Sequence, residues 1–238
     1  MLQKIRYLRA NSEFPWASAI SLGNHTTDFG TTKKHFPITA DATKYILTLS
    51  LAGGIKGVNT YKFVETDNWY DSPLAIDGTI QESFEVVRKY MNSLTAIDVG
   101  NFTQPHTIGM AAYRLNNWVS LLEDPGAFNY VQTLNEFTMP EIGRDLDRIK
   151  QDFIIPDLDS PASFEGIKHL FVPITEIMDE EKQEFLVEKA REGTNLILVG
   201  LLPRFNSDLG KCEVLANAIN CKTQALGKIG TVVTSKDK

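Results

Sequence analysis

In the first hundred residues, segments with the hydrophobic pattern of a strand alternate with segments with the hydrophobic pattern of a helix. This pattern predicts strands and helices in turn. A run of small and apolar residues at 15–23 is closed by glycine and is typical of a short buried strand. Residues 55–64 carry the β-branched and aromatic side chains of a second strand. Between them, Thr39 is placed as the N-cap of a helix that the Gly53–Gly54 pair ends.

A second helix is predicted after the second strand. Thr79 and Glu82 have the spacing of a capping box, in which each side chain satisfies a backbone N–H of the first turn. The apolar positions that follow recur at steps of four, three, four and three, which places them on one helix face: Ile80, Phe84, Val87, Met91 and Leu94. Two consecutive strand–loop–helix units imply parallel strands, and both long polar loops follow strands. In such folds ligands bind at the carboxyl ends of the strands.

The rest of the chain predicts a second α/β domain after a linker at 99–107. Its strands are expected near 108–113, 167–172, 195–200 and 228–233, with the third apolar enough to be buried on both faces. Helices are expected near 141–153, 179–191 and 212–219. The predicted fold class is therefore α/β, with a partial (β/α) barrel at 1–98 followed by a flavodoxin-like, doubly wound parallel sheet at 108–238.

Composition and charge restrict the classes of function. Of the 238 residues, 42% are hydrophobic, and 30 acidic against 24 basic residues give a net charge of −6. Without a basic run, nucleic-acid binding is not expected. No apolar stretch reaches the roughly 18 residues of a membrane span, and the first residues lack the features of a signal peptide. Cys212 and Cys221 have no metal or redox spacing, so free thiols and a cytoplasmic location are expected.

Three stretches together resemble glycoside hydrolase families 35 and 42, especially archaeal-type exo-β-glucosaminidases and β-galactosidases. Residues 52–63 resemble the last barrel strand of those enzymes, and residues 67–78 resemble the loop before their final helix. The stretch from 169–173 through 195–200 is similar to the glutamine-amidotransferase-like domain that follows their barrel and commonly mediates oligomerisation. The resemblance implies a retaining β-glycosidase, which hydrolyses a terminal β-linked sugar through two carboxylates about 5 Å apart.

The catalytic carboxylates of such an enzyme are not evident in this chain. A barrel needs eight strands and about 250 residues, so the strand that carries the acid/base is not among the two predicted here. The usual nucleophile position corresponds to Ala19 or Ile20, neither of which has a carboxylate. Residues 11–14, Asn-Ser-Glu-Phe, resemble the nucleophile segment of animal β-galactosidases, which makes Glu13 a candidate. The alternative, which we favour, is that Glu13 is an exposed residue before a strand.

The same resemblance suggests sugar-binding residues after the second strand. Trp69 and Tyr70 could stack on a pyranose, while the carboxylates of Glu65 and Asp67 could accept hydrogen bonds from its hydroxyls. The alternative is that this aromatic pair only packs over the barrel end. Asn59 and Tyr61 alternate along one strand, so both can point into the barrel, where they either contact a ligand or fill the interior.

Other chemistries find less support in the sequence. His25, His35 and His106 are too far apart to suggest a metal site, and no cofactor is expected. No Gly-x-Gly-x-x-Gly or phosphate-loop motif follows a strand, which disfavours a nucleotide-binding domain. We expect a fragment or degenerate member of the retaining β-glycosidases that is inactive alone. The alternative is a non-catalytic carbohydrate-binding or oligomerisation module. The expected partners are a β-linked sugar, and either further copies of the chain or a protein that supplies the missing strands.

Overall fold

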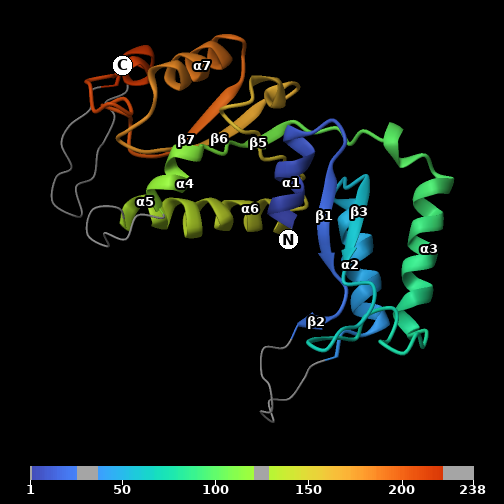
Figure 1. Cartoon of the computed structure of the whole chain (residues 1–238). Helices are drawn as coiled ribbons and strands as arrows, with labels where there is room; N and C mark the ends of the chain where they lie inside the picture. The colour runs from blue at the N-terminus through green and yellow to red at the C-terminus, as the bar shows by residue number, and fades with distance from the viewer. Residues whose placement is uncertain (1, 26–36, 121–128, 222–238) are drawn as a thin grey trace. The chain divides into compact units, whose positions relative to one another are not determined.

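A computed structural model describes residues 2–25, 37–120 and 129–221 as a mixed α/β chain with short parallel sheets (Figure 1). The chain forms two compact units. Unit 1 contains residues 1–107 and 152–166, and unit 2 contains residues 108–151 and 167–238. The predicted strand at 228–233 and His35 lie outside the described residues. Among the described residues, no helix combines the length and apolar character needed to cross a membrane.

Unit 1 is built on two parallel strands, as the sequence predicts. β1 (Trp16–Ser21) pairs with β3 (Gly57–Tyr61), so that Trp16 lies opposite Gly57 and Ser21 opposite Tyr61. The connection between them contains α2 (Ala40–Ala52), and α3 (Glu82–Ala96) follows β3. The predicted N-cap of α2 is confirmed, because the Thr39 side chain accepts a hydrogen bond from the Ala42 N–H at 3.2 Å.

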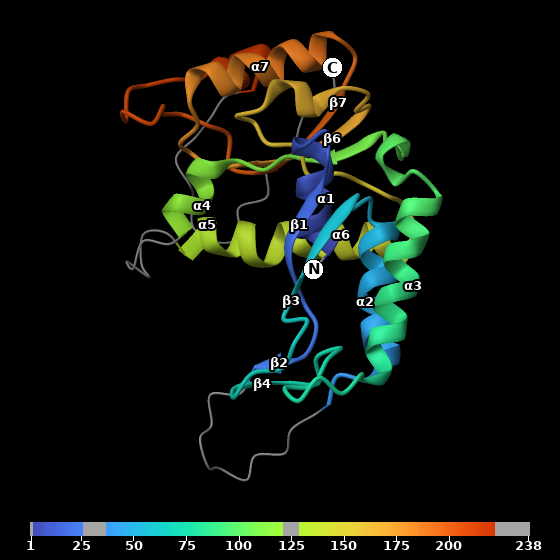
Figure 2. The same cartoon turned by 45° about the vertical axis from the view of Figure 1, so that its right-hand side comes forward.

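Helices α2 and α3 lie side by side next to this sheet (Figure 2). Apolar side chains from both strands and both helices form one buried core, to which α1 (Leu2–Asn11) adds Ile5. The buried members are Ile5, Ile20, Leu22, Leu47, Ile55, Val58, Val87 and Tyr90. Other strand residues remain exposed: Trp16, Ser18, Ala19, Ser21, Asn59 and Tyr61. Within the described residues the sheet has two strands, so each has an edge without a strand neighbour.

The predicted capping box of α3 is wrong. The helix begins at Glu82 after Gln81, and no side chain caps it. Thr79 instead belongs to a turn in which its carbonyl accepts from Ala75 N at 2.9 Å and its N–H donates to Asp77 Oδ1 at 2.9 Å. Ile80 forms an isolated antiparallel bridge with Leu74. These local hydrogen bonds hold residues 75–80 out of the helix.

Tyr90 on α3 provides a test of this core. Its side chain is 9% exposed, and among the described residues its hydroxyl has no hydrogen-bond partner. Burial without a partner raises the pKa of this phenol above its usual value. We expect Tyr90→Phe to be neutral or to stabilise the protein by up to about 1 kcal/mol, because it removes an unsatisfied buried group.

The pH dependence of stability is a second measurement of the effect of Tyr90→Phe. A raised folded-state pKa means that the unfolded chain loses this proton first, so stability falls as the pH rises above the ordinary tyrosine pKa of about 10. Urea unfolding between pH 8 and pH 11 should therefore show a smaller loss in Tyr90→Phe than in the wild type. Tyr45→Phe, at an exposed position of α2, should behave as the wild type. A marked destabilisation by Tyr90→Phe at pH 8 would contradict the conclusion that the Tyr90 hydroxyl is buried without a hydrogen-bond partner.

Residues 152–166 belong to unit 1 although they follow unit 2 residues in the chain. Phe153 is fully buried, and the Arg6 guanidinium lies 3.8 Å from the centre of its ring. Arg9 donates to Asp152 Oδ2 at 2.7 Å and to the Phe153 carbonyl at 3.0 Å. Asn11 donates to the Ile155 carbonyl at 2.9 Å. This segment is therefore held to α1 by charged and polar contacts around the buried ring of Phe153.

Unit 2 contains a three-stranded parallel sheet in the order β5–β6–β7. β5 (Ile108–Met110) pairs with β6 (His169–Ile174), which pairs with β7 (Asn195–Gly200), and α7 (Glu180–Arg191) connects the last two. The other helical segments are α4 (Arg114–Ser120), α5 (Asn129–Thr133), the π-helix η2 (Leu134–Thr138), α6 (Met139–Arg148) and α8 (Val214–Ala218). Unit 1 also contains two 3-10 turns, η1 (Val99–Asn101) and η3 (Pro161–Phe164).

The expectation that 195–200 is buried on both faces is wrong for the described chain. β7 is the last strand in the sheet order, and Asn195, Ile197 and Gly200 are exposed. Cys212 and Cys221 are free thiols, as the sequence predicts.

Candidate functional site at the carboxyl ends of β1 and β3

The two loops that follow β1 and β3 are joined by a short ladder. β2 (Asn24–His25) pairs antiparallel with β4 (Trp69–Tyr70), with Asn24 opposite Tyr70 and His25 opposite Trp69. The ladder brings together side chains from both loops and from the end of β3. We call this group the strand-end cluster: Asn24, His25, Tyr61, Glu65, Trp69, Tyr70 and Asp71.

Trp69 is the buried centre of the strand-end cluster. Its side chain is 7% exposed, and its indole N–H donates to the Leu22 carbonyl at 3.0 Å. The Ser72 hydroxyl donates to the same carbonyl at 3.4 Å. Gly23 has φ +107°, and a Cβ there would lie 2.5 Å from the indole nitrogen, so this approach requires glycine. Trp69 therefore supports the loop after β1 and does not offer an open ring face.

The exposed aromatic side chains of the cluster are those of Tyr61 and Tyr70. Tyr61 is 50% exposed and packs edge-on against Trp69, with ring centres 5.1 Å apart. Tyr70 is 42% exposed, and its hydroxyl donates to the Asp67 carbonyl at 2.8 Å. The His25 ring lies 5.8 Å from Trp69 on the neighbouring strand. The ring of Tyr61 is therefore supported by the buried tryptophan, whereas that of Tyr70 is held through the Asp67 carbonyl.

Carboxylates tie the loops of the cluster together. Asp71 Oδ2 accepts from Asn24 Nδ2 at 3.2 Å and from the Ile38 N–H at 3.0 Å. The Asp71 N–H in turn donates to Glu65 Oε1 at 2.8 Å. Glu65 is half-buried, whereas Asp67 is exposed. Asp71 thus links β2, the start of α2 and the loop after β3, with a backbone φ of +62° that non-glycine residues rarely adopt.

Asp71 and Asn24 are not among the residues proposed from sequence. Their signal was present but weak, since both stand in polar loops after strands, next to other turn-forming residues. The predicted residues Tyr61, Glu65, Trp69 and Tyr70 do come together in the cluster, with Asp67 in the same loop. Asn59 lies two residues before Tyr61 on β3 and is exposed.

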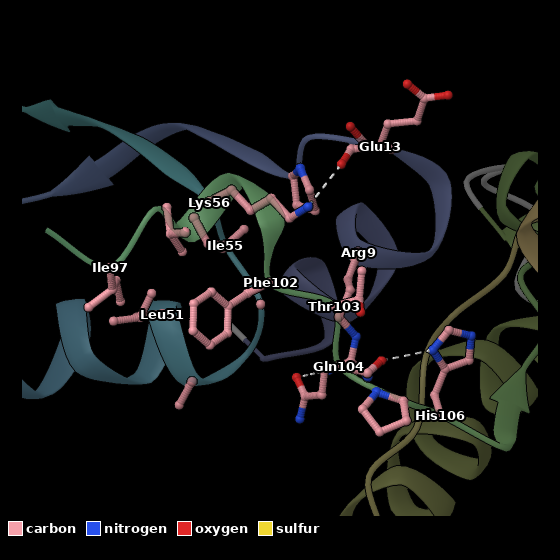
Figure 3. Close-up of a pocket in the computed structure, with 16 residues that line it drawn as sticks. Arg9, Glu13, Leu51, Ile55, Lys56, Ile97, Phe102, Thr103, Gln104 and His106 are labelled. Carbon is pink, nitrogen blue, oxygen red and sulfur yellow. Dashed lines mark hydrogen bonds between the residues drawn. The ribbon is translucent and has the colours of Figure 1, made fainter. Parts of the chain in front are cut away.

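Glu13 is not part of the strand-end cluster. It precedes β1, so the whole strand separates it from the loop at residues 22–25, and a six-residue strand spans about 20 Å. Its carboxylate is exposed and points away from the neighbouring side chains (Figure 3). Its role as a nucleophile stays a prediction, and this position at the amino end of the strand disfavours it.

The positions that usually carry the nucleophile have no acid here. Ala19 is exposed on β1, and Ile20 is buried in the core. Among the residues that the structure describes, no group of three His, Cys, Asp or Glu side chains is arranged to hold a metal ion. The absence of a cofactor stays an expectation.

The chain is similar to known proteins in sequence and in fold. Residues 128–236 match the family described as GLMA-like, second domain. A β-1,2-glucosyltransferase of Ignavibacterium album is 26% identical over 216 residues, covering 79% of this chain and 30% of that protein. The E323A catalytic mutant of Gan42B, a GH42 β-galactosidase from G. stearothermophilus, superposes with a TM-score of 0.67 at 14% identity, covering 89% of this chain and 32% of that one.

A second solved structure gives the same result. The β-galactosidase of the psychrophilic Marinomonas ef1 superposes with a TM-score of 0.61 at 12% identity, covering 85% of this chain and 32% of that one. The chain has a glycoside hydrolase-like fold, as predicted. It spans about a third of the length of these relatives.

Proposed function

We propose that this chain supplies the sugar-binding, carboxyl-terminal part of the barrel of a retaining β-glycosidase of families 35 and 42, together with the domain that follows it. The observation that carries this proposal is the strand-end cluster. Its exposed Tyr61 and Tyr70, the half-buried Glu65 and the buried Trp69 lie where the loops after two parallel strands meet. In (β/α) barrels this end of the strands binds the substrate.

The substrate class follows from the side chains and from the relatives. Tyrosine rings stack on the apolar face of a pyranose, and carboxylates accept hydrogen bonds from its hydroxyls. The named relatives are a β-galactosidase of G. stearothermophilus and a β-1,2-glucosyltransferase. We therefore propose a terminal β-linked galactosyl, glucosyl or glucosaminyl residue as the ligand. In the parent reaction, a glycosyl-enzyme intermediate would pass the sugar to water or to another sugar hydroxyl.

The chain alone is proposed to bind this sugar without turning it over. Neither β1 (Trp-Ala-Ser-Ala-Ile-Ser) nor β3 (Gly-Val-Asn-Thr-Tyr) carries a carboxylate, whereas the retaining mechanism needs two about 5 Å apart. The catalytic pair would have to come from strands outside β1 and β3. The exposed strand residues, and the edges of this sheet that have no strand neighbour within the described part of the chain, support a partner that supplies those strands, or a longer chain that contains them.

Turnover measurements test this proposal directly. The purified chain should not hydrolyse aryl β-galactosides or aryl β-glucosaminides, and Glu13→Gln should give the same flat trace. Hydrolysis that Glu13→Gln abolishes would contradict the proposal and would identify Glu13 as the nucleophile. Hydrolysis that Glu13→Gln leaves unchanged would contradict the statement that the chain lacks a catalytic pair.

The second candidate function is a non-catalytic carbohydrate-binding or oligomerisation module. The absence of a carboxylate on β1 and β3 favours it over a complete enzyme. The two candidate functions predict different results when the missing barrel strands are supplied. Addition of a protein or segment that carries the other barrel strands should restore hydrolysis if the chain is part of a glycosidase. It should leave a binding module inactive.

Tyr61 gives the sharpest mutational test of sugar binding. Tyr61→Ala is expected to weaken binding of methyl β-D-galactoside or methyl β-D-glucoside about fivefold, because an aromatic contact contributes on the order of 1 kcal/mol. Tyr45→Ala is the matched control, since Tyr45 is an exposed tyrosine on α2 outside the cluster. Titration calorimetry measures both. Equal affinity of the two variants would remove Tyr61 from the site.

A further inference from the structure

A pocket of about 520 Å³ lies at the amino ends of β1 and β3, away from the strand-end cluster. It is formed by the end of α1, the turn before β1, the end of α2, the residues leading into β3 and residues 97–106 (Figure 3). All of these residues belong to unit 1. The volume lies within the range of pockets that bind small molecules.

One wall of the pocket is apolar. The side chains of Leu51, Ile97 and Phe102 lie close together there (Figure 3), and the buried Ile55 also lines the pocket. Phe102 is 62% exposed and Ile97 is also exposed. An apolar ring or chain placed against this wall would remove these side chains from water, which favours binding.

Lys56 contributes a positive charge to the pocket without an acidic partner. Its half-buried ammonium donates to the Gly100 carbonyl at 2.8 Å and to the Glu13 carbonyl at 3.3 Å. Among the described residues no carboxylate forms an ion pair with it. An ammonium has three N–H groups, so one remains for a ligand. Backbone carbonyls fix its position but do not neutralise its charge.

The other charged groups of the pocket do not compensate Lys56. The side chain of Arg9 is 8% exposed and is paired with Asp152 at 2.7 Å, and Arg6 contacts the same carboxylate at 3.7 Å, so Asp152 is already engaged by two guanidinium groups. The Glu13 carboxylate points away from the Lys56 ammonium (Figure 3). His106 also lines the pocket, and its Nδ1 lies 3.3 Å from the Gln104 carbonyl. The pocket thus combines an apolar wall with the Lys56 ammonium, which has no acidic partner among the described residues.

We propose that this pocket binds a small molecule that carries an apolar ring or chain and one carboxylate. The carboxylate accepts a hydrogen bond from the Lys56 ammonium, and the apolar part lies against Leu51, Ile97 and Phe102. This second site does not depend on sugar binding, because it shares no residue with the strand-end cluster.

The test compares an acid with its neutral analogue. The probes are 2-naphthoate and 2-naphthamide, titrated into the ¹⁵N-labelled chain and followed by two-dimensional NMR. We expect 2-naphthoate to shift amide signals of residues 51–56 and 97–106 and to bind about tenfold more tightly than the amide, since a charge-assisted hydrogen bond distinguishes them. Equal affinity for the two probes, or shifts confined to other regions, would overturn the proposal.

Two variants with matched controls separate the charge from the cavity. Lys56→Met should bind the acid and the amide equally, whereas Lys44→Met, an exposed lysine on α2, should retain the preference for the acid. Ala52→Trp places an indole in the pocket from an exposed position at the end of α2 and should abolish binding of both probes. Ala218→Trp, exposed at the end of α8, should bind as the wild type. Binding of 2-naphthoate that survives in both pocket variants would overturn the proposal.

Discussion

Replacing Trp69 by alanine is expected to destabilise unit 1 by about 3 kcal/mol and to abolish sugar binding at the strand-end cluster. The change removes a buried indole that packs against Tyr61 and His25. It also leaves the Leu22 carbonyl without the donor that lies 3.0 Å from it. The loops after β1 and β3 would then lose the side chain that holds them together.

Urea unfolding and sugar titration of the same variants measure this effect. Trp118→Ala, at an exposed tryptophan of α4, should change both quantities little. The stability and sugar affinity of Trp69→Phe should lie between those of the wild type and Trp69→Ala. The phenyl ring keeps most of the packing, but one hydrogen bond of about 1 kcal/mol is lost. A Trp69→Ala protein with wild-type stability and wild-type sugar affinity would contradict the role assigned to the indole.

Replacing Phe153 by alanine is expected to destabilise unit 1 by about 3–5 kcal/mol. The side chain is fully buried, and it is the aromatic ring around which residues 152–166 attach to α1. Its loss leaves a cavity and removes the ring that lies under the Arg6 guanidinium. Arg9 and Asp152 would keep their ion pair, and Ile154, Leu158 and Phe164 of the same segment would still be buried.

Hydrogen exchange distinguishes local from global loss in this variant. We expect Phe153→Ala to increase exchange at residues 153–158 and in α1 more than in β6 and β7 of unit 2. Phe137→Ala, at an exposed phenylalanine of η2, is the control and should leave exchange in unit 1 unchanged. Uniform protection in both variants would mean that residues 152–166 attach to unit 1 by other contacts.

The sequence predicts the elements of unit 1 because local chemistry determines them. Thr39 caps α2 through its own side chain, and the glycines after α2 end it, so both signals are readable within a few residues. The parallel pairing of β1 and β3 follows from the helix that connects them. The position of Tyr61, Trp69 and Tyr70 at the carboxyl ends follows from the same topology.

Other features depend on contacts between distant residues and were not predictable in this way. The attachment of residues 152–166 to α1 requires Arg9 and Asn11 to meet Asp152 and Ile155, more than a hundred residues away. The start of α3 was misplaced because a local turn at residues 75–79 competes with the capping box. The position of Asp71 between the two loops depends on the pairing of β2 with β4.

The placement of Trp69 shows that residue type alone does not determine whether an aromatic side chain is buried or exposed. An aromatic pair in a loop after a strand suits either a sugar platform or a packing role. Here Trp69 is buried and Tyr70 is exposed, so the two members of the pair have different environments. The burial of Trp69, which distinguishes it from Tyr70, depends on Gly23 and Leu22 in the other loop.

NMR mapping of methyl β-D-galactoside and methyl β-D-glucoside on the ¹⁵N-labelled chain tests most directly whether the strand-end cluster binds a sugar. At least one sugar is expected to shift the amide signals of residues 24–25, 59–61 and 65–71, while those of β6 and β7 stay unchanged. Sugar-induced shifts elsewhere only, or none with either sugar at saturating concentration, would contradict the assignment of the strand-end cluster as a sugar site.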